Sequence, residues 1–288
     1  PPRERAKDLS PLVTDRHGEW LHAFATAEGR WRFEADLDAI DPSFVARVVT
    51  VEDKRFYSHW GVDPLAVARA GFSALQSGEI TSGASTITMQ AARLLEPRKR
   101  TLGAKAVEMI RALQIERRLS KQEILELYLT LAPYGGNIEG VRAASRIYFD
   151  KEPVRLTDAE QALLIALPQA PEARRPDLRP EAARLARRDI LQKLAAAGAM
   201  DEQHAEEADE ARLPSARHKL PRLAYHAARA IAVSEKPGAT VSTLDASLQR
   251  RAETMLSDYV SRFDDGATAS LLIVENKTRA VRASVGSS

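Results

Sequence analysis

A succession of helix signals between residues 41 and 212 constrains this chain more than any other feature of its sequence. Two capping boxes, Ser120-Lys-Gln-Glu123 and Thr157-Asp-Ala-Glu160, precede apolar runs, and such boxes mark helix N-termini. Asp41-Pro42 opens a further helix, because proline suits the first helical turn. An Ala/Arg/Glu-rich segment over residues 180–212 predicts one or two more. We therefore predict a mainly α core over residues 41–212.

The segments on either side of this core carry strand signals. Residues 1–40 contain short alternating runs with turn residues, which predict an N-terminal β-hairpin segment. Residues 270–274 and 280–285 predict a strand pair joined by a turn. We expect the two flanks to be α/β in character and to lie together. The chain begins and ends abruptly, so we also expect both ends to be cuts in a longer protein.

Charge and cysteine content bound the chemistry. The formal net charge is only +2, but Arg and Lys crowd into residues 93–105 and 174–188. This uneven distribution indicates a local anionic partner. The chain has no cysteine, which excludes thiolate metal sites, disulfides and a cysteine nucleophile. No run of about eighteen apolar residues occurs, so we predict no membrane-spanning helix within the chain.

The first polar cluster is Thr50-Val-Glu-Asp-Lys-Arg-Phe-Tyr-Ser-His-Trp-Gly-Val-Asp63, which follows an apolar helical run. The end of a packed helix can hold a carboxylate in a fixed position beside a cleft. Glu52 is the candidate for this carboxylate, acting as a general acid or base. A solvated helix cap has a similar composition, and this alternative stays open on the cluster alone. We expect His59 to pack among the aromatic residues.

The second polar cluster is Ser82-Gly-Ala-Ser-Thr-Ile-Thr-Met-Gln90. It supplies hydroxyls, the amide of Gln90 and backbone N–H groups freed by Gly83. These groups can hydrogen-bond a sugar or a phosphate without adding charge. Plain helix capping is the alternative. The cluster is not a nucleotide-binding phosphate loop, because the sequence has no G-x-x-x-x-G-K-[ST] pattern.

The third cluster combines a run of cations with a charged helix face. Its members are Arg93, Arg98, Lys99, Arg100, Lys105, Glu108 and Arg111. The last three share one face of a helix predicted over residues 101–119. The opposite face carries Leu102, Ala106, Ile110 and Leu113. Guanidinium and ammonium groups gathered in this way suit a phosphate or a pyrophosphate. A solvated, ion-paired helix face is the alternative.

Other catalytic signatures are absent from the sequence. There is no H-E-x-x-H pattern or paired histidine spacing to indicate zinc. There is no G-x-S-x-G pattern, and no S-x-x-K pattern of the kind that carries the acyl-enzyme serine of penicillin-binding domains. We therefore predict no metal-ligand set from the sequence.

Taken together, the clusters resemble five motifs of the peptidoglycan glycosyltransferase family (glycosyltransferase family 51), as it occurs in class A bifunctional penicillin-binding proteins of the 1C type. The motifs are Glu52-Asp-Lys-Arg-Phe-Tyr-Ser-His-Trp-Gly-Val-Asp63, Gly83-Ala-Ser-Thr-Ile-Thr-Met-Gln90, Lys105-Ala-Val-Glu108, Lys121-Gln-Glu-Ile-Leu-Glu-Leu-Tyr-Leu129 and Gly140-Val-Arg-Ala-Ala-Ser-Arg-Ile-Tyr-Phe149. Met89 is similar to the 1C variant of the second motif. Ala104 departs from the family, which usually has a basic residue there, and this departure bears on how a pyrophosphate is held.

This resemblance implies a lysozyme-like glycosyltransferase domain over residues 41–212, with a small membrane-facing jaw subdomain at about residues 64–98. It implies a linker over residues 213–255 and the truncated start of a transpeptidase domain over residues 256–288. The transpeptidase serine is expected beyond the end of the chain. No transpeptidase activity is therefore expected from this chain.

The reaction implied by the resemblance is the polymerisation of lipid II in bacterial cell-wall synthesis. The 4-hydroxyl of lipid II attacks the anomeric carbon of a lipid-linked glycan strand with inversion, which forms a β-1,4 bond and releases undecaprenyl pyrophosphate. A sugar hydroxyl needs a base, for which Glu52 is the candidate. The leaving pyrophosphate needs positive charge, which Arg93, Arg100 and Lys105 can supply. Inversion requires the base and these cations to face one another across a cleft.

The resemblance also assigns supporting residues. Glu108 is a second catalytic candidate, which we expect either to orient Lys105 or to help hold a divalent cation, Mg²⁺ or Mn²⁺. The sequence itself requires no cofactor. We expect four further motif residues to bind substrate or pyrophosphate or to fix the walls of the site: Asp53, Arg55, Ser85 and Gln90.

The expected partners follow from the substrate. They are lipid II, the lipid-linked glycan strand, the membrane interface, other cell-wall synthesis proteins and moenomycin-type inhibitors. The expected location is the periplasmic face of the bacterial inner membrane, with the N-terminal anchor absent from this chain. Residues 64–76 are amphipathic enough to lie in a membrane interface, although a buried core helix fits the same pattern.

Three competing functions fit the sequence less well than this one. A lysozyme-like muramidase also uses a glutamate, but the basic cluster argues against it. A non-enzymatic scaffold is disfavoured because Glu52, Lys105 and Glu108 are all intact. Nucleic-acid binding is not expected, because the arginine-rich stretches lack interleaved aromatic residues.

Overall fold

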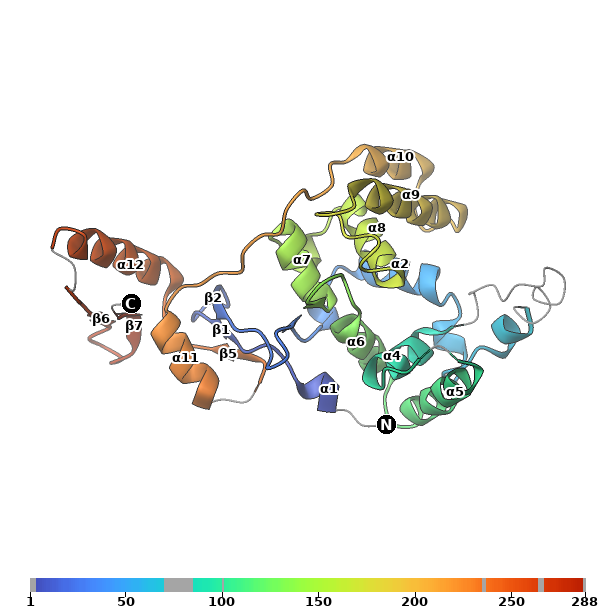
Figure 1. Cartoon of the computed structure of the whole chain (residues 1–288), viewed down its shortest axis with the longest axis horizontal. Coiled ribbons are helices and arrows are strands. Elements are labelled where there is room, and N and C mark those ends of the chain that lie inside the picture. The colour runs from blue at the N-terminus through green and yellow to red at the C-terminus, as the bar shows by residue number, and fades with distance from the viewer. Residues whose placement is uncertain (1–3, 70–84, 100, 235–236, 264–266, 287–288) are drawn as a thin grey trace. The chain divides into compact units, whose positions relative to one another are not determined.

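The structure is a computed structural model that describes residues 4–69, 85–99, 101–234, 237–263 and 267–286. The chain forms two compact units (Figure 1). Unit 1 consists of residues 1–7 and 34–218, and unit 2 consists of residues 8–33 and 219–288. Each unit is described by itself below.

Unit 1 is built mainly of helices (Figure 1). Its α-helices are α1 (Glu4–Lys7), α2 (Pro42–Glu52), α4 (Ile87–Leu95), α5 (Leu102–Glu116), α6 (Lys121–Leu131), α7 (Val141–Phe149), α8 (Asp158–Ala166), α9 (Pro180–Ala196) and α10 (Glu202–Glu210). Short 3₁₀ helices lie at Leu37–Ala39, Phe56–Ser58, Pro153–Arg155 and Leu167–Gln169, and β4 is Ile138–Glu139. Residues 64–69 are also helical. The mainly α fold predicted from the sequence is confirmed.

Side-chain caps explain where two of these helices begin. Both predicted capping boxes are present, Ser120 with Glu123 at α6 and Thr157 with Glu160 at α8. In each box the hydroxyl accepts a backbone N–H from the first turn, while the glutamate accepts the N–H of the capping residue. Two N–H groups that the helix itself leaves unpaired are thereby satisfied. Local sequence alone therefore sets these two starting points.

Helix α8 forms much of the core of unit 1. Most of its side chains are buried, including Ala162, Leu163 and Leu164. It packs against α2, α7, α9 and α10. Burial of this kind stabilises a fold by roughly 1.5–3 kcal/mol for each large apolar side chain. The helices that surround α8 are therefore held together through it.

A buried glutamine connects α8 to the first turns of α2. The Gln161 amide nitrogen donates to the Asp41 carboxylate at 3.3 Å and to the Leu156 carbonyl at 3.2 Å. Its amide oxygen accepts from the Arg47 guanidinium at 2.6 Å. An unpaired buried amide would cost about 1–3 kcal/mol, so these bonds hold α2 in one position on α8. The far end of α2 is Glu52, which this contact helps to place.

Unit 2 joins segments from both flanks of the chain in one sheet. Strand β1 (Leu12–Thr14) pairs antiparallel with β2 (Trp20–Ala23) and parallel with β5 (Ala239–Val241), which gives the order β2-β1-β5. The parallel pairing confirms the expectation that the two flanks lie together. Strands β6 (Leu271–Val274) and β7 (Val281–Val285) form the predicted antiparallel pair.

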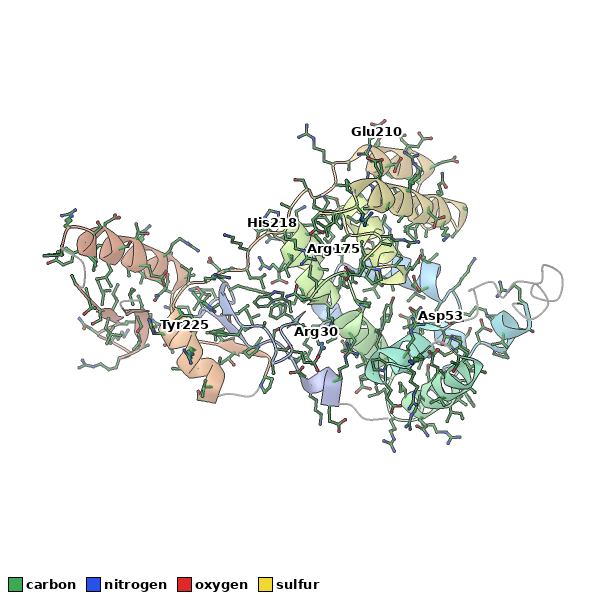
Figure 2. The ribbon with its side chains drawn as sticks, viewed as in Figure 1. Arg30, Asp53, Arg175, Glu210, His218 and Tyr225 are labelled. Carbon is green, nitrogen blue, oxygen red and sulfur yellow. The ribbon has the colours of Figure 1, made fainter. Side chains whose placement is uncertain are left out.

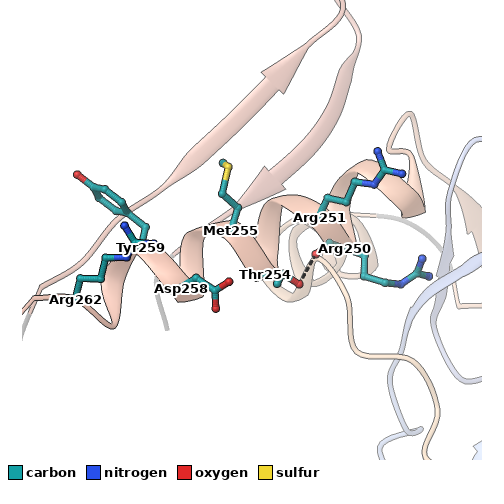
Figure 3. A pocket seen from close by; sticks show the side chains of 7 residues that line it. All are labelled: Arg250, Arg251, Thr254, Met255, Asp258, Tyr259 and Arg262. Carbon is teal, nitrogen blue, oxygen red and sulfur yellow. Dashed lines mark hydrogen bonds between the residues drawn. The ribbon is translucent and has the colours of Figure 1, made fainter.

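Unit 2 also contains β3 (Trp31–Arg32), α11 (Tyr225–Ser234) and α12 (Ala246–Val260). Helix α11 is not predicted from the sequence; Ala228 is its one buried side chain. Helix α12 has an open hollow along one side, lined by Arg250, Arg251, Thr254, Met255, Asp258, Tyr259 and Arg262 (Figure 3). These seven side chains do not include a hydrogen-bonded pair of a carboxylate and a side-chain amide.

Two sequence expectations concern organisation. None of the helices in the described part of the chain is long and apolar enough to cross a bilayer. The division into residues 1–40, 41–212, 213–255 and 256–288 stays a prediction, because compactness alone does not define a domain. Much of the predicted jaw, residues 70–84, lies outside the described residues.

The capping box of α6 predicts a measurable loss of stability. Ser120→Ala removes the hydroxyl that accepts the N–H of Glu123, so we expect the free energy of unfolding to fall by about 1 kcal/mol. Gln122→Ala is the matched control, because Gln122 is exposed on the same helix. Urea denaturation followed by circular dichroism measures both. Equal midpoints for the two variants would contradict the assignment of the cap.

Candidate active site

The Glu52 carboxylate is held between two side-chain amides. Gln90 on α4 donates to its Oε2 at 2.8 Å, and Gln169, just beyond α8, donates to its Oε1 at 2.8 Å. Glu52 is half-buried at the C-terminal end of α2. Since a carboxylate offers about four lone-pair positions, the two amide bonds leave others free to accept a further proton donor.

Two buried tyrosines lie beneath Glu52. Tyr128 on α6 and Tyr134 in the following turn line a small cavity together with Glu52. Burial, reinforced by the negative charge of Glu52, raises the pKa of Tyr134 and of Tyr128 well above the usual value. Both therefore remain neutral phenols near neutral pH. Tyr128 and Tyr134 therefore add no second negative charge beside the Glu52 carboxylate.

Asp53 is buried and connects the end of α2 to the start of α4 (Figure 2). Its two oxygens each lie 3.0 Å from the His59 Nε2, and one accepts the backbone N–H of Ile87 at 3.0 Å. Ile87 is the first residue of α4. The structure thus places Asp53 where it orients α4, and His59 packs against Phe56 as expected.

Arg55 is engaged by a second carboxylate. Its guanidinium forms an ion pair with Asp63, and Asp63 also accepts the backbone N–H groups of Leu65 and Ala66 at the start of the helical residues 64–69. Arg55 therefore stabilises the approach to the predicted jaw. About a third of its side chain stays exposed.

Helix α4 carries Gln90 and Arg93 one turn apart, so both lie on one face. The charges of Glu52 and Arg93 both act on Tyr128. Among the described residues no carboxylate forms an ion pair with Arg93. This face of α4 consequently presents the amide that holds Glu52 together with a guanidinium that no described carboxylate neutralises.

Lys105 connects α5 to the residue that precedes the cap of α4. Its ammonium donates to the Ser85 hydroxyl at 2.6 Å and to the Glu108 carboxylate at 3.0 Å. Glu108 is mostly buried and Lys105 is about a third exposed. Two other members of the cationic cluster, Arg98 and Arg111, form ion pairs with the Glu96 carboxylate.

The hydrogen bond of Arg98, together with the charge and the hydrogen bond of Arg111, outweighs desolvation and lowers the pKa of Glu96. Glu96 therefore stays ionised near neutral pH, which keeps both arginines paired. Arg100, which the sequence includes in the pyrophosphate group, lies outside the described residues, as do Ser82 and Gly83.

The apolar face of α5 is turned outward. Ile110 is 56% exposed and Leu113 is 44% exposed, whereas Ala112 and Ile115 are buried. An amphipathic pattern ordinarily places its apolar stripe towards the core. Here the loop at Gly61, which has a positive φ, passes so close that an added Cβ would lie 2.9 Å from the Ala112 carbonyl. That close packing directs a different side of the helix inward.

The residues that sequence reasoning missed are Gln169, Tyr128 and Tyr134. Gln169 lies between Pro168 and Pro171, which the sequence marks only as the end of a helix. The sequence does carry a signal for Gln169. Gln169 is a polar residue shortly after the buried helix α8, just as Glu52 is a polar residue at the end of α2. The two tyrosines fall within apolar runs and resemble ordinary core residues.

The divalent cation expected beside Glu108 stays a prediction. No group of three or more His, Asp or Glu side chains gathers in the described part of the chain. The described partner of Glu108 is a cation, Lys105.

Comparison with known proteins identifies the family. A protein-family profile described as "Transglycosylase" matches residues 17–195. The chain therefore belongs to the transglycosylase family. Penicillin-binding protein 1C of Escherichia coli K12 is 39% identical to the chain over 276 residues, which cover 96% of the chain and 36% of that protein.

Two other relatives match a shorter part. Penicillin-binding protein 1A of Aquifex aeolicus is 39% identical over 178 residues, or 62% of the chain and 24% of that protein. Penicillin-binding protein 1A of Neisseria gonorrhoeae is 45% identical over 148 residues, or 51% of the chain and 18% of that protein. The chain thus spans about a third or less of these relatives. The resemblance noted in the sequence is confirmed.

The placement of Asp53 predicts a structural role that can be measured. Asp53→Ala leaves the Ile87 N–H and the His59 ring nitrogen without their shared acceptor, so we expect unfolding to become easier by about 1–3 kcal/mol. Asp38→Ala, at an exposed position, serves as the control. If thermal unfolding shows the same small change for both variants, Asp53 does not anchor α4.

Proposed function

We propose that this chain is a peptidoglycan glycosyltransferase that polymerises lipid II into β-1,4-linked glycan strands with release of undecaprenyl pyrophosphate. The observation that carries the proposal is the placement of Glu52, whose carboxylate is bound by Gln90 on the face of α4 that also carries Arg93. Membership of the transglycosylase family supports it. In this proposal the base comes from α2 and the cation from α4, because inversion requires the two groups to act on opposite sides of the reacting carbon.

Glu52 acts as the general base in this proposal. It accepts the proton of the lipid II 4-hydroxyl as that oxygen bonds to the anomeric carbon of the donor strand. The bond from this carbon to the pyrophosphate oxygen breaks, and its electron pair leaves with the lipid pyrophosphate. A positioned base of this kind contributes about 10²–10⁴-fold to the rate. The amides of Gln90 and Gln169 hold the carboxylate in place for the transfer.

The pyrophosphate is bound by cations and by neutral donors. Arg93 and Lys105 stabilise the charge that develops on the leaving group, and we assign Arg100 to the same role from its place in the run of cations before Lys105. Charge stabilisation in a preorganised site is commonly the largest catalytic contribution. The Ser85 hydroxyl and the Glu108 carboxylate orient the Lys105 ammonium.

The decisive test is the substitution Glu52→Gln, which keeps the size of the side chain and removes its basicity. We expect polymerisation of lipid II, followed by gel electrophoresis of the glycan strands, to fall by about 10²–10⁴-fold. Glu206→Gln, at an exposed position on α10, should leave the rate unchanged. Polymerisation at the wild-type rate in Glu52→Gln would remove Glu52 from this role. Soluble muropeptides released from purified peptidoglycan would instead favour a muramidase.

We further propose that α5 and the loop that contains Trp60 and Gly61 lie in the lipid interface at the periplasmic face of the bacterial inner membrane. Trp60 is 84% exposed, and its neighbour Gly61 packs on α5, which exposes Ile110 and Leu113. Aromatic and aliphatic side chains grouped in this way favour the boundary between lipid headgroups and acyl chains. The donor and acceptor are both lipid-linked in the proposed reaction. Cell-wall synthesis proteins and moenomycin-type inhibitors stay predicted partners.

Vesicle sedimentation tests the lipid contact. Ile110→Ser combined with Leu113→Ser should weaken binding to phosphatidylglycerol/phosphatidylethanolamine vesicles by about tenfold or more, because two large apolar side chains are lost. Leu185→Ser is the matched control, since Leu185 is 62% exposed on α9. Should the Leu185 variant lose as much binding as the double variant, the contact would not be specific to α5.

A further inference from the structure

Gln169 binds Glu52 in an amide orientation that a third residue determines. A glutamine amide has one end that donates and one that accepts. The Arg174 guanidinium donates to the Gln169 Oε1 at 3.0 Å and to the Ala166 carbonyl at 2.8 Å. The Gln169 Nε2 donates to the Glu52 Oε1 at 2.8 Å. Only this orientation satisfies both neighbours, because a guanidinium cannot accept and a carboxylate cannot donate.

The two amides that hold Glu52 differ in their surroundings. Gln90 lies on α4 and is half-buried, whereas Gln169 is exposed at the end of a short 3₁₀ helix. A rigid helix therefore fixes one oxygen of the carboxylate. The other oxygen depends on an exposed side chain that could rotate its amide freely in water. Arg174 is half-buried and is anchored on the carbonyl of Ala166, so it supplies the missing rigidity.

We propose that Arg174 and Gln169 are positioning residues that together aim the Glu52 carboxylate at the acceptor hydroxyl. This inference deepens the proposed function and rests on it. Arg174 does not touch Glu52 in the described contacts, so it acts through Gln169. Without Arg174 the amide of Gln169 can turn its oxygen towards Glu52, and two acceptors would then oppose each other.

The proposal specifies which kinetic constant changes. Gln169→Ala should lower kcat by about tenfold, which is the loss expected for one hydrogen bond to a charged group, and leave KM within about twofold. Arg174→Ala should also lower kcat, by several-fold. Arg174→Lys keeps a donor near the Gln169 oxygen and should recover most of the activity. An equal rise of KM in all of these variants would indicate substrate binding and would contradict the proposal.

A double-mutant cycle separates the relay from two independent effects. If Arg174 acts through Gln169, adding Arg174→Ala to Gln169→Ala should change kcat by less than about twofold, because the intermediate group has already been removed. Multiplicative losses would overturn the relay. Arg184→Ala is the matched arginine control, since Arg184 is half-exposed on α9 and pairs with Glu181.

A second readout does not depend on turnover. The side-chain amide protons of Gln169, assigned in ¹H–¹⁵N spectra by their loss in Gln169→Ala, should shift and exchange faster with water in Arg174→Ala but not in Arg184→Ala. Unchanged Gln169 signals in Arg174→Ala would overturn the relay even if the chain polymerises lipid II. Conversely, a wild-type chain without polymerase activity would refute the proposed function, while these spectra would still decide whether Arg174 orients Gln169.

Discussion

The carboxylate of Glu52, held by two amides, is the interaction on which the site depends. The donors come from elements far apart in sequence, Gln90 on α4 and Gln169 beyond α8. Three helices must therefore be in place before the carboxylate is oriented. The hydrogen bonds of Gln161 fix α2 on α8, and Asp53 fixes the start of α4. Buried polar contacts away from Glu52 itself thus set the geometry of the site.

The distribution of charge around Glu52 follows from the same packing. The two neighbouring phenols stay neutral because burial and the nearby carboxylate both oppose their ionisation. Arg98 and Arg111 are paired with Glu96, and Lys105 is paired with Glu108. Arg93 has no such ion pair among the described residues. Within the described part of the chain, a guanidinium without an ion pair and an ammonium of fixed position are thus available to the pyrophosphate that we propose as the leaving group.

Local signals in the sequence predict the parts of the fold that depend on neighbouring residues. The capping boxes at Ser120 and Thr157 locate two helix starts, and the polar cluster after an apolar run makes Glu52 a candidate. Other features depend on contacts between distant segments. The outward apolar face of α5 results from close packing at Gly61, and Gln169 reaches Glu52 only through the packing of α8 against α2. No periodicity in the chain encodes either contact.

The stereochemistry of the product tests the account most directly. If Glu52 and the cations of α4 and α5 act on opposite sides of the anomeric carbon, an α-linked lipid pyrophosphate donor must give a β-linked strand. The anomeric proton coupling constant in the NMR spectrum of strands polymerised by this chain reports the configuration. The account predicts β-1,4 linkages alone. A strand with retained α-linkages would contradict a single direct displacement with Glu52 as its base.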